Sequence, residues 1–365
     1  LVLRRASDFE PSGSVIAAVT LAAIACLSFA AGQYPYFRIP GAPLGAQLAG
    51  LGLIVLSCGL FLVAGHQIRQ VVNLRRLTWL FLIAGGYICL AHVVPGLAFA
   101  AGWSGAATIG SMFWIWFVAL SCSHALFNLE LTTKTRLALL CLTAAAVYRG
   151  FFLAGSWASG WLPPLVALIT ILLFRVPRTV FGFGFVALPT GLYIWDSFYR
   201  LIMANEQYSW MSRWEAWQIL LQVFEKNPLI GLGPSNYHAY TTLYPILGWY
   251  VSFNSHNNYI DLLMQTGIVG LLAFFWLVVE VLRILLRLAR SKASGSFPRA
   301  YAIGAIGGLM GALAAGMLGD WILPFYYNVG VTGFRSSLLF WVFLGGGFAL
   351  KRISVRETAG HELHE

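Results

Sequence analysis

Residues 257–282 read NNYIDLLMQTGIVGLLAFFWLVVEVL, an apolar run that contains only two charged residues. A helix needs about 20 mostly apolar residues to cross the hydrocarbon core of a bilayer. The run is long enough, and Asn254, Ser255 and Asn257 at its start are residue types that favour the N-cap of a helix. The stretch therefore predicts a membrane-spanning helix.

The composition of the 365-residue chain extends this reading to the whole sequence. Hydrophobic residues make up 59%, charged residues 10%, and the mean hydropathy is +0.76. Soluble domains hold about 25% charged residues, so soluble, disordered and coiled-coil classes are excluded. We predict an all-α polytopic membrane protein, with residues 1–365 as a single transmembrane domain of about ten helices. The predicted spans are 14–32, 44–66, 77–100, 107–127, 137–155, 157–175, 179–199, 257–282, 300–319 and 336–350.

The positions of the basic residues support this count. With the N-terminus in the cytoplasm and alternating sides, 17 of the 23 Lys and Arg residues fall on inner segments. That bias satisfies the positive-inside rule. The net charge of +10 therefore indicates topology and attraction to anionic membrane lipids rather than nucleic-acid binding. The six outer cations are Arg38, Arg149, Arg200, Arg213, Lys226 and Arg335.

The longest polar-side segment is the loop 200–256, predicted on the periplasmic face between spans seven and eight. It is rich in Trp and Tyr, which favour the membrane–water interface. A loop of this length is usually functional. We expect it to lie on the membrane with short interfacial helices and to carry the chemistry.

Arg213 and His256 are the candidate functional residues of this loop. Ser212 and Glu215 have the spacing of a capping box, which predicts a helix start with Arg213 in its first turn. Arg213 is then either a solvated cation or an anion-binding group beside free helix N–H groups. His256 falls at the N-terminus of span eight, where the helix dipole favours the neutral imidazole that a general base needs. Asp261, one turn inward, could orient a ring nitrogen or an acceptor hydroxyl.

Several of these segments resemble the O-antigen ligase and O-antigen polymerase superfamily, whose members are bacterial inner-membrane glycosyltransferases. The resemblance is carried by RWEAW, FEKNPLIGLGPSNY and SHNNYIDLLMQTGIVGLL, over residues 213–272. A later stretch, DWILPFYYNVGVTGFRSSLLFWVFLGG at 320–346, is similar to the family's C-terminal end. The clearest match covers about 75 residues, and the span pattern extends it over most of the chain.

The resemblance implies a reaction and its partners. A glycan moves from undecaprenyl pyrophosphate to an acceptor hydroxyl, first of all on lipid A-core, without cofactor or metal. His256 is expected as the catalytic base. The expected pyrophosphate-binding arginines are Arg213, Arg149, Arg335 and Arg200, and the expected acceptor-contacting or orienting residues are Asp261, Asn257 and His238. Asp320 is expected to be a polar helix end.

Other functions remain open on the sequence. Polymerisation of the glycan and protein O-glycosylation would use the same loop chemistry. A lipid-glycan transporter would also be a basic polytopic protein, but it should show internal repeats or charged, broken helices near the middle of the membrane. A non-catalytic scaffold would not require His256 or Arg213.

Overall fold

The computed structural model describes residues 12–97, 108, 110–155, 157–182, 184, 207–291 and 296–362. Within this part of the chain the regular structure is helical, and the only β-pairing is an isolated bridge between Ile246 and Trp249. The helices are α1 Gly13–Ala31, α2 Leu44–Gln67, α3 Val71–Val93, α6 Ser111–Phe127, α7 Thr133–Tyr148, α8 Ala158–Arg175, α11 Gln207–Phe224, α12 Tyr237–Tyr240, α13 Asn258–Arg290, α14 Ser296–Leu318 and α15 Phe334–Glu362. A π-helical segment, Arg149–Leu153, extends α7.

Eight helical segments in the described ranges are long and apolar enough to cross a membrane, and the 17-residue α6 is a ninth apolar helix. These nine correspond to nine of the ten predicted spans. The third helix begins at Val71 rather than at residue 77, so the helix includes Arg75 and Arg76. The predicted span 179–199 lies almost entirely outside the described residues.

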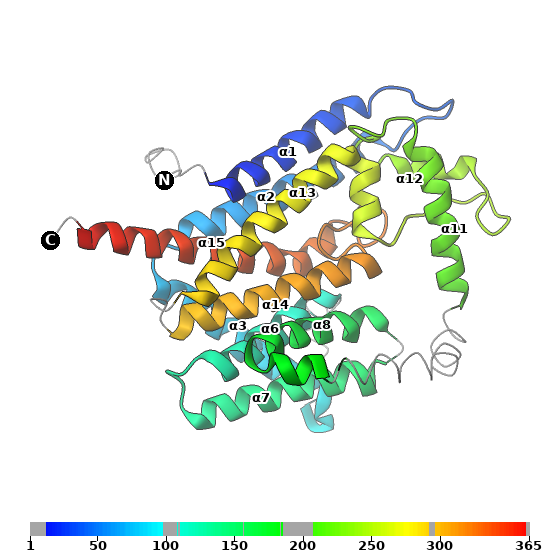
Figure 1. Ribbon diagram of the computed structural model, residues 1–365. Coiled ribbons are helices and arrows are strands. Elements are labelled where there is room, and N and C mark those ends of the chain that lie inside the picture. Colours follow the sequence, from blue (N-terminus) through cyan, green and yellow to red (C-terminus); the bar gives the residue numbers. More distant parts are fainter. Residues whose placement is uncertain are drawn as a thin grey trace.

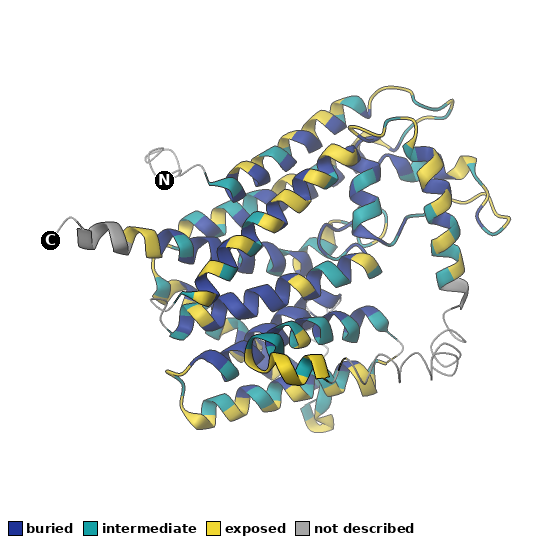
Figure 2. Cartoon of the chain, in the orientation of Figure 1, coloured by how far each residue is buried: buried dark blue, intermediate teal, exposed yellow. Residues whose placement is uncertain are grey.

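The helices form a bundle of roughly parallel rods (Figure 1), with α1 beginning and α15 ending on the same side. Helix α14 lies at the centre, packed against α6, α8 and α13. Nearly every residue of α6 is buried, whereas outer helices expose large apolar side chains such as Leu80 and Ile83 (Figure 2). Apolar side chains on the outside of a bundle are what a lipid environment selects.

Helix α11 lies across the end of the bundle opposite the start of α1 (Figure 1), and we call this the loop end. The segment from α11 to the start of α13 has its own small apolar core. That core consists of Ala216, Ile219, Leu220, Val223, Leu232, Tyr237, Tyr240 and Ile246, closed by Met264 and Phe325. The loop is therefore a folded unit seated on the helix ends, while the Trp214 and Leu221 side chains of α11 stay exposed.

Candidate functional site

The loop is joined to α13 at a kink in that helix. Gly267 has φ +67° and ψ −173°, a conformation nearly exclusive to glycine. The kink breaks the helical hydrogen-bond ladder, and residues 228–233 replace the missing partners. Leu232 N–H donates to the Met264 carbonyl at 2.9 Å, and Ile268 N–H donates to the Pro228 carbonyl at 2.9 Å. Gly231 allows this close approach to the helix backbone, since a Cβ at that position would lie 2.5 Å from Gly267 N.

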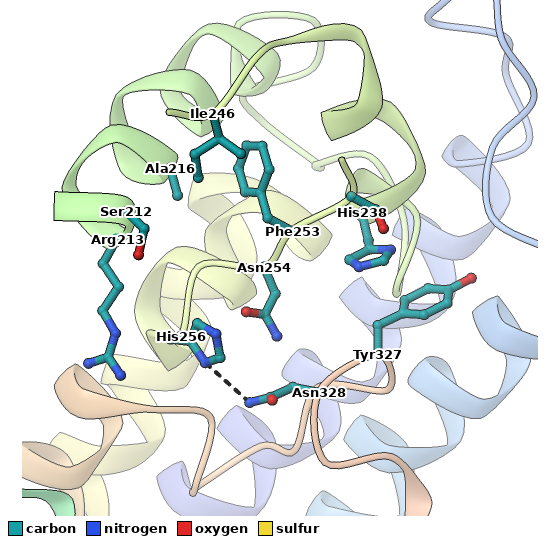
Figure 3. A pocket seen from close by; sticks show the side chains of 11 residues that line it. Ser212, Arg213, Ala216, His238, Ile246, Phe253, Asn254, His256, Tyr327 and Asn328 are labelled. Atoms are coloured by element: carbon teal, nitrogen blue, oxygen red, sulfur yellow. Dashed lines mark hydrogen bonds between the residues drawn. The ribbon is translucent and has the colours of Figure 1, made fainter. Parts of the chain in front are cut away.

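His256 is held immediately before this helix. Asn257 is the N-cap of α13, and its side-chain oxygen accepts from the backbone N–H of Tyr259 at 3.0 Å and of Ile260 at 3.3 Å. His256 itself has φ +48°, in the left-handed region that few non-glycine residues adopt. The backbone turn directs its ring towards Asn328, in the segment between α14 and α15 (Figure 3).

A buried hydrogen-bond network fixes the residue before His256. Asp261 is 2% exposed, and its Oδ1 accepts from the Ser255 hydroxyl at 2.7 Å and from the Tyr237 hydroxyl. Burial, with Asp261 adjacent, raises the pKa of Tyr237, so its hydroxyl stays protonated and donates. The Ser255 N–H in turn donates to Tyr237 Oη at 3.3 Å. Asp261 therefore supports the His256 turn from beneath, while its Oδ2 has no hydrogen-bond partner.

Two cavities meet at His256. The loop cavity, of about 340 Å³, is lined by Ser212, Arg213, Ala216, His238, Ile246, Ser252, Phe253, Asn254, His256, Tyr327 and Asn328 (Figure 3). The helix-end cavity, of about 260 Å³, is lined by Trp157, Ala158, Ser159, Trp210, Arg213, His256, Leu318, Gly319, Asp320, Trp321, Asn328 and Val329. Arg213, His256 and Asn328 belong to both. A reaction between molecules bound in the two cavities would take place beside these three side chains.

A second polar contact reaches His256 from the segment between α14 and α15. The Asn328 amide nitrogen lies 3.4 Å from His256 Nδ1 and 2.6 Å from Asp320 Oδ1. Asp320 is 2% exposed, and its Oδ2 accepts from the Phe325 N–H at 2.9 Å. Asp320 is thus more than the polar helix end expected from the sequence, because it anchors the residue that contacts the imidazole.

The charges around the imidazole favour its neutral form. Burial lowers the pKa of His256 below 6.5, and the positive charge of Arg213 lowers it further. Burial raises the pKa of Asp320, an effect opposed by N–H groups of Phe325 and Asn328 and by Arg213. The lowered pKa favours the neutral imidazole, which is the protonation state that a general base requires.

The structure corrects the predicted start of the loop helix. Helix α11 begins at Gln207, so Ser212 and Arg213 lie beyond its first turn and do not form its N-terminus. Glu215 does not complete a capping box, since its Oε2 accepts from the Leu247 N–H at 3.0 Å. The free helix N–H groups expected beside Arg213 are therefore absent. Arg213 nevertheless faces the site from the helix side, with its guanidinium carbon 5.7 Å from the centre of the Trp210 ring.

The other predicted arginines lie elsewhere. Arg149 packs its guanidinium over the Trp114 ring at 4.4 Å, and its Nη1 is buried with no hydrogen-bond partner. Arg335 is exposed at the start of α15. Neither residue lines the loop cavity or the helix-end cavity. Arg200 lies outside the described residues.

Among the predicted acceptor contacts, His238 shares the loop cavity with His256. Its ring stacks on Tyr327 with centroids 4.1 Å apart, and burial lowers its pKa. Asn257 and Asp261 line neither cavity, because the first caps α13 and the second supports the turn. In the described ranges no three His, Cys, Asp or Glu side chains are grouped closely enough to hold a metal ion.

Residues 125–275 match the family model described as O-antigen ligase. The match covers less than half of the 365-residue chain. No curated protein matches the chain. The match agrees with the resemblance noted in the sequence. Together with the apolar helices long enough to cross a membrane, it supports a membrane glycosyltransferase of the ligase or polymerase type.

The family match runs from the end of α6 into α13 and includes Arg213, His238 and His256. Asp320 and Asn328 lie outside it, although the fold places them in the same site. Sequence reasoning missed Asn328 altogether. The available signal was a polar pair eight residues apart in an aromatic segment, too weak to single out without knowledge of the fold.

Proposed function

We propose that this O-antigen ligase domain transfers a glycan from undecaprenyl pyrophosphate to an acceptor hydroxyl on the periplasmic face of a bacterial inner membrane. The observation that carries the proposal is that two cavities meet at His256 beside Arg213, where burial and the arginine charge lower the His256 pKa. A transfer reaction needs two substrate sites, a base between them and a cation for the leaving group.

The two cavities differ in a way that favours one assignment of substrates. The helix-end cavity lies at the ends of the membrane-type helices α8 and α14 and contains Trp157, Trp210 and Trp321. A polyprenyl donor keeps its tail in lipid, so its pyrophosphate reaches the protein at such helix ends. We assign the donor pyrophosphate to this cavity beside Arg213, and the acceptor to the loop cavity.

The step is a single inverting displacement. The acceptor oxygen bonds to the anomeric carbon of the donor sugar, and the bond from that carbon to the pyrophosphate oxygen breaks. His256 takes the proton of the acceptor hydroxyl, and undecaprenyl pyrophosphate leaves with the electron pair. Arg213 stabilises the charge that develops on the pyrophosphate, since a planar guanidinium can contact two phosphate oxygens at once. No metal or other cofactor has a part in the proposed step.

Lipid A-core is the acceptor we propose, because the matched family model is described as O-antigen ligase. In a strain that lacks the chain, loss of capped lipopolysaccharide while long lipid-linked glycans persist indicates ligation. Lipid-linked glycans of single repeats only would indicate polymerisation. Unchanged glycolipids with loss of glycosylated proteins would indicate protein O-glycosylation.

The chemistry is tested in proteoliposomes that contain the purified protein, a polyprenyl-pyrophosphate-linked glycan and lipid A-core, with no metal or nucleotide added. His256→Gln should insert normally and lose about 10²–10⁴-fold in rate, the usual contribution of a general base. His66→Gln is the matched control, because His66 lies at the opposite end of α2 from the loop and bonds the Leu62 carbonyl. Wild-type turnover by His256→Gln at normal expression contradicts the role of His256.

The arginines are sorted by Arg→Lys substitution, since an ammonium cannot reproduce the two-pronged contact of a guanidinium. Arg213→Lys should lose most transfer. Arg38→Lys, an exposed arginine in the segment between α1 and α2, should keep it. Arg149 and Arg335 line neither cavity. Arg149→Lys and Arg335→Lys test the separate proposal that these arginines also bind pyrophosphate.

A further inference from the structure

The Asn328 side chain contacts both Asp320 and His256. The Asn328 amide nitrogen carries two hydrogens and lies near two acceptors, Asp320 Oδ1 at 2.6 Å and His256 Nδ1 at 3.4 Å. Asp320 is buried, and Asn328 is exposed to the cavities. The amide thus connects a fixed carboxylate to the imidazole, and Figure 3 shows its contact with His256 at the cavity surface.

The carboxylate determines which end of the amide faces the imidazole. Asp320 accepts from the Phe325 N–H through Oδ2 at 2.9 Å, and its Oδ1 lies 2.6 Å from the Asn328 amide nitrogen, so both carboxyl oxygens are placed as hydrogen-bond acceptors. The opposite orientation of the amide would place the Asn328 carbonyl oxygen against the Asp320 oxygen, which is repulsive. The NH₂ group must therefore lie between Asp320 and His256.

The orientation of the amide in turn fixes the tautomer of His256. A ring nitrogen that faces an N–H donor must offer its lone pair, so Nδ1 is the acceptor and Nε2 carries the proton in the neutral ring. The basic nitrogen of His256 is then Nδ1, adjacent to Asn328. At 3.4 Å the contact is longer than the usual 2.7–3.2 Å hydrogen bond, so it is weak and easily exchanged for a better partner.

We propose that Asn328 and His256 Nδ1 together form the binding site of the acceptor hydroxyl, with Asp320 as the positioning residue. A hydroxyl group is complementary to this pair because it accepts one hydrogen bond and donates another. Its oxygen accepts from the Asn328 N–H, and its O–H donates to Nδ1. This inference rests on the proposed function and adds to it the atom that acts as base and a residue that binds the acceptor.

The proton and the electron pair of the step each move to a defined atom. As the acceptor oxygen bonds to the anomeric carbon, its proton passes to Nδ1 and the pyrophosphate departs with the electron pair of the broken bond. The resulting imidazolium has N–H groups at both nitrogens, so Nδ1 no longer accepts from Asn328. Loss of the proton to water restores the starting tautomer, which Asp320 and Asn328 favour again.

The tautomer is measured without substrate on the whole chain in lipid nanodiscs, by ¹⁵N NMR of histidine-labelled protein. His256→Gln assigns the His256 signals among the seven histidines. The wild-type ring should be protonated at Nε2. Asn328→Asp places a carboxylate against Nδ1, which should move the proton to Nδ1 and raise the His256 pKa. A wild-type ring protonated at Nδ1, or an Asn328→Asp ring still protonated at Nε2, overturns the inference.

Asn254→Asp is the matched control for added charge. Asn254 also lines the loop cavity, and no hydrogen bond joins it to His256. An acid there should raise the His256 pKa through space but leave the proton on Nε2. If Asn254→Asp changes the tautomer as much as Asn328→Asp does, charge alone explains the effect and the inference is refuted.

Transfer rates separate this inference from the proposed function. Asn328→Asp and Asn328→Ser should each lower kcat/KM for the acceptor by about 10²–10⁴-fold, the range for a base in the wrong state or place. Asn328→Ser provides the test if the aspartate variant folds poorly. Wild-type transfer with either folded variant refutes the inference alone. A correct tautomer in a wild-type protein that transfers no glycan refutes the proposed function and, with it, the role of the hydroxyl.

Discussion

Gly267→Ala tests how strongly the functional loop depends on the kink in α13. A Cβ at this position would lie 2.5 Å from Ile230 N and closer still to the Leu229 carbonyl. Both atoms belong to the backbone, so no side-chain rotation relieves the clash. The backbone conformation at Gly267 is also one that an alanine adopts only with strain.

The size of the effect follows from these two terms. Placing a non-glycine residue in this region of φ and ψ costs about 1–3 kcal/mol. Moving residues 228–230 away from the helix also weakens the bonds from Ile268 N–H to Pro228 and from Val269 N–H to Leu229, at 2.9 and 3.3 Å. Each such bond contributes about 0.5–1.5 kcal/mol net. The sum is about 2–6 kcal/mol, with about 4 kcal/mol as the central value.

The measurement is thermal unfolding of the purified protein in detergent, followed by size-exclusion chromatography after heating. About 4 kcal/mol should lower the apparent Tm by at least about 5 °C, scaling down from the shifts known for smaller domains. Gly52→Ala is the control, because Gly52 lies in α2 with open space around its Cβ position, so alanine should be neutral or slightly stabilising. Equal Tm values for Gly267→Ala and wild type would show that the loop does not depend on the kink.

Three further predictions address the site and the topology. Asn258→Leu should lower the free energy of unfolding by about 2–4 kcal/mol, as measured by thermal unfolding. The Asn258 amide bonds the Leu323 carbonyl at 2.6 Å and the Ile322 N–H at 2.7 Å, and its loss leaves these buried backbone groups unpaired. Arg213→Gln should raise the His256 pKa towards 6.5, because the arginine charge lowers it. In an NMR titration the neutral ring should then persist less far into the acid range. An unchanged titration contradicts the proximity of the two groups. Ser252 lies at an exposed loop position, and Ser252→Cys is made in a variant whose five native cysteines are replaced. The new thiol should react with an impermeant reagent added to intact spheroplasts. Protection until lysis would contradict a periplasmic loop.

The membrane-crossing helices were predictable because lipid imposes a simple requirement. Each helix must present about 20 apolar residues, and such windows are visible in the sequence without any knowledge of partners. The start of α11 was not predictable in the same way. Residues 207–211 contain no helix-breaking residue, so the helix continues upstream of Ser212, and Glu215 bonds the distant Leu247 N–H. A capping pattern competes with such tertiary contacts and does not by itself define a helix start.

Part of the candidate site was also predictable. His256 was singled out by its place at the start of the predicted span eight, and Arg213 as a cation in a predicted loop helix. The fold places both at the junction of two cavities. Asn328 was not predictable, since its place beside His256 depends on tertiary contacts: Asp320 bonds its amide, and Asn258 holds residues 322 and 323 against the start of α13. Such a pairing over about 65 residues depends on the packing of α13 against α14, which the pattern of apolar residues does not specify.

The polar residues at the start of α13 explain why its first turns are not simply apolar. Asn257 caps the helix, Asn258 holds the segment that carries Asp320 and Asn328, and Asp261 holds Ser255 and Tyr237. One helix end thereby sets the positions of the loop before it and of a segment some 60 residues after it. The arrangement has a cost, because Asp261 Oδ2 is buried without a hydrogen-bond partner, and an unsatisfied buried group costs about 1–3 kcal/mol.

A leucine at position 261 would avoid that cost but would leave the Tyr237 and Ser255 hydroxyls without their shared acceptor. The residue freed by such a change is the one directly before His256, whose left-handed backbone depends on fixed neighbours. The buried carboxylate therefore exchanges stability for a fixed imidazole position. In the proposed mechanism the rate depends on where the ring of His256 lies, so we regard the first two turns of α13, together with the cavities, as the core of the proposed site.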